Sequence, residues 1–136
     1  MPARKSVSSG SPWESRVGYS RAVRVANHVF VSGTTGTDQQ GKAVARGNAY
    51  SQAVHALKKI QSALESLGAR LEDVTRTRMY VTDITKWEEI GRAHNEFFRD
   101  VKPATSMVEV RRLISDDILV EIEADAVVES DQPSRT

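Results

Sequence analysis

Hydrophobic and polar residues follow two different periods along this chain, and the longer period predicts two helices. From Asn48 to Leu67, apolar residues recur every three or four positions and so share one helical face. Gly68 follows, at a place where helices commonly end. A second apolar stripe in residues 86–100 predicts another helix, with Thr85 and Glu88 forming a capping box at its start.

The shorter period, in which every second residue is apolar, predicts β-strands. The clearest example runs from Leu119 to Val128, where the apolar side chains point one way and Glu121, Glu123 and Asp125 point the other. Further strands are expected in residues 74–81 and 106–113, and as a hairpin around Asn27 within residues 21–33. The predicted order of elements is therefore β-β-α-β-α-β-β.

This order predicts an α+β domain of two layers, with two helices packed on one face of a mixed β-sheet. We place the domain at residues 17–128, between a flexible Ser-rich lead-in at residues 1–16 and a flexible polar tail at residues 129–136. The second sheet face then meets either water or another subunit. Its acidic side chains suit solvation, whereas a subunit interface would retain them for a ligand site. The pattern alone leaves both open.

The composition is that of one soluble globular domain, with 136 residues of which 39% are apolar and 27% charged. The formal net charge of +1 provides no overall basic surface for nucleic acid. The absence of cysteine excludes disulfides and thiolate sites, and it fits the reducing cytoplasm. No apolar run approaches the roughly 20 residues that span a bilayer, and the first residues lack the apolar core of a secretory signal. We expect a cytoplasmic protein with no membrane and no nucleic-acid partner.

General catalytic motifs do not identify a reaction. The chain has no GxSxG elbow, Walker loop or HExxH helix. Its three histidines are scattered, and we expect no metal and no cofactor. Ser32, Thr105 and Ser106 are nucleophiles by residue type, but none has a neighbouring base in the sequence.

Six short segments are more specific when they are taken together. They read Gly-Tyr-Ser-Arg-Ala-Val at residues 18–23, Val-Phe-Val-Ser-Gly at 29–33, Arg-Thr-Arg-Met-Tyr-Val-Thr-Asp at 76–83, Phe-Phe at 97–98, Pro-Ala-Thr-Ser-Met-Val-Glu-Val at 103–110 and Leu-Val-Glu-Ile-Glu-Ala at 119–124. In this order and spacing they resemble the Rid (YjgF-type) family of enamine/imine deaminases. The resemblance implies a chorismate-mutase-like subunit and a homotrimer with a barrel-like core, which buries the second sheet face. It also implies small-molecule clefts between the subunits.

In the best-known branch of this family, the clefts hydrolyse enamines and imines to 2-keto acids and ammonia. An arginine binds the substrate carboxylate through a bidentate pair, and a glutamate on the closing strand places or activates water. Carried onto this chain, that glutamate is Glu121, the candidate catalytic residue, although a structural role at the trimer interface is the alternative. The corresponding substrate-binding positions are Tyr19, Ser32, Gly33, Thr105, Ser106 and Met107.

Thr105 stands at the position where the family has its arginine. A threonine hydroxyl carries no charge, and loss of a buried charged partner typically costs about 2–5 kcal/mol of binding. Arg78, Arg111 and Arg112 are candidate replacements for the missing charge. Each of the three is equally explained as a surface or interface residue.

Three functions therefore stay open. Hydrolysis of enamines or imines follows from the resemblance and from Glu121. A non-catalytic trimer that binds a metabolite or acts as a regulator follows from Thr105. Ribonuclease activity or translation inhibition is often attached to this family, but the near-neutral charge and the lack of a histidine pair or metal cluster disfavour it. The sequence leaves undecided whether the protein is an enzyme.

Overall fold

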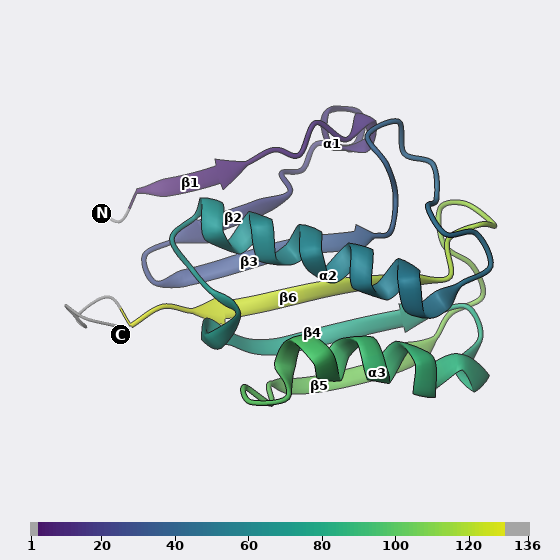
Figure 1. The fold of residues 1–136 in the computed structure, drawn as a ribbon. Coiled ribbons are helices and arrows are strands. Elements are labelled where there is room, and N and C mark those ends of the chain that lie inside the picture. The colour runs from purple at the N-terminus through teal and green to yellow at the C-terminus, as the bar shows by residue number, and fades with distance from the viewer. Residues whose placement is uncertain (1–2, 130–136) are drawn as a thin grey trace.

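A six-stranded β-sheet forms the centre of the protein in the computed structural model, which describes residues 3–129 (Figure 1). Its strands, in the spatial order β1-β2-β3-β6-β4-β5, are β1 (Arg4–Val7), β2 (Ala22–Val25), β3 (His28–Thr35), β6 (Val120–Val127), β4 (Val74–Val81) and β5 (Ala104–Glu109). The helices are α1 (Pro12–Val17), α2 (Ala49–Ser66) and α3 (Trp87–Phe98), with the 3-10 helices η1 (Leu71–Asp73) and η2 (Ile84–Lys86). Neighbouring strands are antiparallel except β4 and β5, which are parallel and connected through α3.

The hydrophobic core lies between the sheet and the two long helices, α2 and α3, which cover one of its faces (Figure 1). Leu57, Ile60 and Leu64 of α2 are fully buried in this core, together with Ile122 and Ala124 of β6. The predicted α+β fold is confirmed, and the boundaries of α2, β4 and β6 lie within one residue of those expected. Within residues 3–129, no helix is both long enough and apolar enough to cross a membrane.

The N-terminal segment differs from the flexible lead-in that was expected over residues 1–16, because it contains β1 and α1. β1 pairs along its whole length with β2, and a local sequence pattern does not reveal such a pairing. Ser11 caps α1 by accepting a hydrogen bond from the Trp13 amide, and Pro12 occupies the first turn. Residues 130–136 of the expected tail lie outside the described residues.

The start of α3 and the extent of β5 also differ from the prediction. The predicted capping box between Thr85 and Glu88 is not formed. The Thr85 hydroxyl donates instead to the Asp83 carboxylate at 2.6 Å, and Asp83 caps the start of η2, which contains Thr85. β5 begins and ends earlier than the expected residues 106–113, because it pairs with β4 and stops beside the end of that strand, where Val81 lies opposite Glu109.

The sheet face opposite the helices carries both apolar and ion-paired side chains. Phe30 and Val108 on this face are 48% and 47% exposed. Between them, Arg78 of β4 forms ion pairs with Glu123 at 3.4 Å and with Asp125 at 3.2 Å, both on β6. Two of the three acids predicted on this face are therefore paired with a cation within the sheet.

Candidate active site

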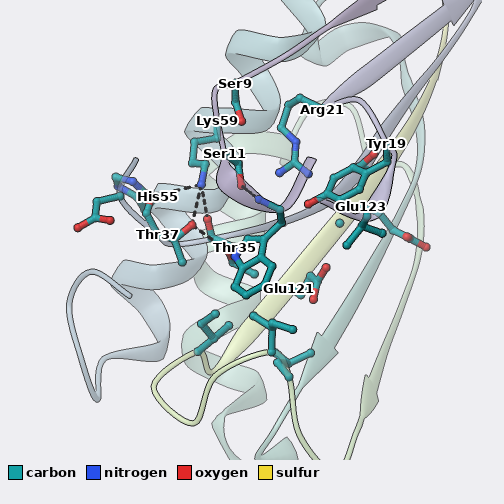
Figure 2. A pocket seen from close by; sticks show the side chains of 18 of the residues that line it. Ser9, Ser11, Tyr19, Arg21, Thr35, Thr37, His55, Lys59, Glu121 and Glu123 are labelled. Carbon is teal, nitrogen blue, oxygen red and sulfur yellow. Dashed lines mark hydrogen bonds between the residues drawn. The ribbon is translucent and has the colours of Figure 1, made fainter. Parts of the chain in front are cut away.

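A cavity of about 1100 Å³ opens at one end of the sheet. Its walls come from α1, the end of β3, the start of β6, α2 and the residues 112–118 that precede β6 (Figure 2). Its charged lining comprises three cations and three acids, with Tyr19 and His55 beside them: Arg21, Lys59, Arg112, Asp38, Glu121 and Glu123. The cavity thus joins segments that lie far apart in the sequence.

The Ser32–Gly33 pair forms an irregularity in β3 that shapes this cavity. The pairing of β3 with β6 changes register between Val31 and Thr34, so Ser32 and Gly33 lie in a β-bulge. A Cβ atom at Gly33 would lie only 2.1 Å from Oε2 of Glu121. Any side chain at residue 33 would therefore displace the Glu121 carboxyl from its position.

Glu121 has a carboxyl group with no hydrogen-bond or ion-pair partner among residues 3–129, although it is only partly exposed. Burial raises its pKa above the ordinary glutamate value; the positive charge of Arg21 lowers it and the charge of Glu123 raises it further. A carboxyl group with a raised pKa, unpaired and facing a cavity, is suited to take up and release a proton.

Arg21 is the functional candidate that the sequence analysis missed. It precedes β2, is only 6% exposed and lines the cavity. Its backbone oxygen accepts a hydrogen bond from the Ser32 amide at 3.0 Å, which holds it beside the bulge. The guanidinium lies 5.6 Å from the Tyr19 ring centroid, in a cation–π contact. Arginine at residue 21 was visible in the sequence, but nothing local marked it as buried.

Lys59 of α2 adds a second positive charge to the cavity lining. Its Nζ donates to the backbone oxygens of Thr35 and Thr37 at 2.8 and 3.2 Å and to the Thr37 hydroxyl at 3.1 Å (Figure 2). Burial lowers the Lys59 pKa, and the charge of Arg21 lowers it further, whereas Asp38 and Glu14 raise it. The ammonium thus holds the end of β3 against α2.

The predicted site residues fall in two separate places. Tyr19, Ser32, Gly33 and Glu121 line the cavity, whereas Thr105, Ser106 and Met107 lie on β5, at the far edge of the sheet. Of the three arginines considered as replacement cations, Arg112 lines the cavity, Arg78 is paired with acids of β6, and Arg111 is exposed outside it.

Thr105 uses its hydroxyl inside the subunit. Its Oγ1 lies 2.7 Å from the hydroxyl of Thr77, which lies 2.8 Å from Nε2 of His94 on α3. Thr77 is fully buried, and burial lowers the His94 pKa below its ordinary value. Thr105, which was expected at the family's arginine position, therefore links β5, β4 and α3.

The two-layer α+β fold is that of solved YjgF-family structures. Residues 10–128 match the family described as endoribonuclease L-PSP, and the chain belongs to this family. A RutC family protein from Pyrococcus abyssi is 34% identical over 111 residues, which cover 82% of this chain and 87% of the relative.

Solved structures agree with this assignment. A Mycobacterium tuberculosis protein described as a member of the YjgF/YER057c/UK114 family is 51% identical, with a TM-score of 0.85 over 93% of this chain and all of that chain. The Escherichia coli YjgF gene product is 28% identical, with a TM-score of 0.77 over 90% of this chain and 98% of that one. The resemblance to the Rid (YjgF-type) family is confirmed.

Proposed function

We propose that this protein is a homotrimer whose intersubunit clefts bind small molecules and hydrolyse enamines or imines to 2-keto acids and ammonia. The observation that carries the proposal is the carboxyl group of Glu121. It faces the cavity without a hydrogen-bonding partner among the described residues, and burial raises its pKa. Membership of the Rid (YjgF-type) family supports the same reaction.

The proposed chemistry adds water across a C=N bond. The oxygen of water bonds to the imine carbon, and the Glu121 carboxylate takes the proton that this water releases. The protonated carboxyl gives that proton to the nitrogen, and a carbinolamine results. The carboxylate then takes the hydroxyl proton of the carbinolamine and passes it to the amino nitrogen; as the C=O bond forms, the C–N bond breaks, and ammonia leaves a 2-keto acid behind. General acid–base catalysis of this kind typically contributes about 10²–10⁴-fold in rate, and a carboxyl with a raised pKa suits both proton transfers.

The assembly is proposed from the sheet face that the helices leave open. Phe30 and Val108 are about half exposed there, and a trimer would cover such apolar side chains. Association would also allow Ser106 and Met107 of one subunit's β5 to complete the cavity of a neighbour. Light scattering coupled to size-exclusion chromatography should give three times the mass of one chain, and a monomeric mass would contradict this part of the proposal.

Keto-acid release tests the reaction. Purified protein is mixed with 2-aminoacrylate or 2-iminobutyrate generated in situ, and 2-keto acid formation is compared with buffer. We expect acceleration by the wild type and a loss of about 10²-fold or more in Glu121→Gln, since the amide cannot exchange the proton. No acceleration by a folded wild type would refute hydrolysis of these substrates.

A non-catalytic metabolite-binding trimer is the second candidate, and one observation favours it. Thr105 replaces the family's arginine, and its hydroxyl is engaged by Thr77 instead of facing a ligand. If the wild type is inactive and Thr105→Arg gains deaminase activity, the scaffold is competent but serves binding or regulation. Thermal-shift screening of 2-keto acids would then identify ligands, and activity of the unmodified protein would exclude this candidate.

RNA cleavage is considered because the matching family is described as endoribonuclease L-PSP. The net charge of +1 gives no concentrated basic surface that would favour RNA. We therefore expect no RNA cleavage by pure protein. Cleavage that persists in Glu121→Ala and separates from the protein on a further column would come from a contaminant.

A further inference from the structure

Arg21 is the least satisfied polar group among the described residues. Its side chain is 93% buried, and Nε and Nη2 have no hydrogen-bond partner within residues 3–129. Nη1 makes one long hydrogen bond, to the Thr34 hydroxyl at 3.4 Å. A guanidinium stays charged at all physiological pH values, and buried donors without acceptors are rare and costly. The arrangement therefore points to an acceptor that arrives from outside the subunit.

Glu14 balances the charge of Arg21 without filling its donors. The nearest approach, between Nε of Arg21 and Oε2 of Glu14, is 3.9 Å, which is too long for a hydrogen bond. The Glu14 carboxylate already accepts hydrogen bonds from the hydroxyls of Ser8 and Ser9 and from the Ser9 amide. This pair accounts for the burial of a charge, but Nε and Nη2 still lack an acceptor. Because both atoms are themselves buried, the guanidinium must turn toward the cavity to meet a ligand.

The two unpartnered donors have the geometry that a carboxylate requires. Nε and Nη2 lie on the same edge of the planar guanidinium, and their parallel N–H groups match the two oxygens of a carboxylate in a bidentate pair. Tyr19 packs against the guanidinium at 5.6 Å and restrains its orientation. Lys59 adds positive charge nearby, and its hydrogen bonds all go to neutral oxygens.

The position of Arg21 relative to Glu121 fits a small 2-imino acid. The Arg21 carbonyl oxygen accepts a hydrogen bond from the Ser32 amide. The Glu121 carboxyl lies against the next residue, Gly33, where a side chain would otherwise be. Arg21 lies close enough to influence the ionisation of Glu121. Figure 2 shows both side chains pointing into the same cavity. A carboxylate held by the guanidinium would leave the adjacent imine carbon facing Glu121.

We propose that Arg21 is the carboxylate anchor of this cavity, in place of the arginine that Thr105 replaces, and that the ligand class is a small 2-imino or 2-keto acid. This inference rests on the proposed hydrolytic site for its choice of ligand. The anchor comes from the segment before β2, whereas Thr105 lies on β5.

Binding of 2-ketobutyrate, measured by calorimetry on the full-length protein in its native assembly, tests the inference without turnover. Arg21→Gln should raise the Kd about thirty-fold or more, as for loss of a buried charged partner. Arg21→Lys keeps the charge but not the two parallel donors, so its Kd should lie between the two. Arg46→Gln is the matched control, since Arg46 is an exposed arginine that does not line the cavity, and its Kd should stay within about threefold of wild type. Arg112→Gln probes the other arginine of the cavity lining.

A second measurement needs no variant and holds if Arg21→Gln fails to fold. The wild type should bind 2-ketobutyrate about thirty-fold or more tightly than the uncharged 2-ketobutyramide. Equal affinity for acid and amide would overturn the inference. So would unchanged binding in a folded Arg21→Gln protein, or a loss of binding that appears in Arg112→Gln instead.

These outcomes separate the anchor from the reaction. Binding of 2-ketobutyrate through Arg21 without keto-acid release from imines would support Arg21 as the carboxylate anchor and refute the proposed hydrolysis. Imine hydrolysis with the same KM in wild type and Arg21→Gln would support the proposed hydrolysis and refute Arg21 as the anchor.

Discussion

Gly33→Ala is the substitution whose effect the structure specifies most fully. The new Cβ would lie 2.1 Å from Oε2, 2.9 Å from Cδ and 3.2 Å from Cγ of Glu121. Nonbonded heavy atoms come into favourable contact at about 3.5–4.0 Å, so the carboxyl must move by more than about 1 Å. Only the end of a flexible side chain has to move, and an off-rotamer side chain costs about 0.5–1.5 kcal/mol. The fold should therefore survive.

The displaced carboxyl should lose most of its catalytic effect. A displacement of about 1 Å at a reacting group costs on the order of 10²-fold in rate, so kcat/KM for 2-iminobutyrate should fall by about that factor. The assay is keto-acid release, read beside thermal unfolding. Gly91→Ala is the matched control: an added Cβ meets nothing within 4 Å, and the change should stabilise α3 by about 0.5–1 kcal/mol with unchanged activity. Full activity in a folded Gly33→Ala protein would refute the assigned position of Glu121.

Three further predictions concern charge and buried polar contacts. Burial raises the Glu14 pKa, but the hydrogen bonds from Ser9 and Ser8 and the positive charge of Arg21 together lower it below the ordinary value. The stabilising effect of Glu14 is therefore present above pH 4.5 and lost as pH falls through the lowered pKa. Glu14→Gln should remove that acid-range slope from the free energy of unfolding and cost about 3 kcal/mol at neutral pH; an unaltered slope would contradict the assignment. Thr77→Val should cost about 1–3 kcal/mol, because His94 and Thr105 lose their buried partner, and denaturant titration would show no change if these contacts are idle. Because its pKa is raised, Glu121 should give kcat/KM an acidic limb above the ordinary glutamate value, and a limb at or below pH 4.5 would count against a catalytic carboxylate.

The parts of the fold that the sequence predicted well are those with long, regular patterns. α2 and β6 carry one periodicity over many residues, and their bounds lie within one residue of the prediction. β1 was missed because its four residues are ordered by pairing with β2 and not by a pattern of their own. The Thr85–Glu88 capping box was wrong because Asp83, two residues earlier, engages the Thr85 hydroxyl first.

The site shows the same limit. Tyr19, Ser32, Gly33 and Glu121 were named from family motifs, and the structure places all four in the lining of one cavity. Arg21 stood inside one of those motifs without an assigned role, because its burial depends on α1 and β3 folding around it. The sequence therefore offers Arg78, Arg111 and Arg112 as replacement cations, whereas the proposed anchor, Arg21, is distinguished only by its burial in the fold.

A crystal structure with bound 2-ketobutyrate tests the central claim most directly. The account predicts the ligand carboxylate on Nε and Nη2 of Arg21, with the keto carbon facing the Glu121 carboxyl over Gly33. A ligand whose carboxylate lies against Thr105 or Arg112, with the donors of Arg21 left empty, would contradict it.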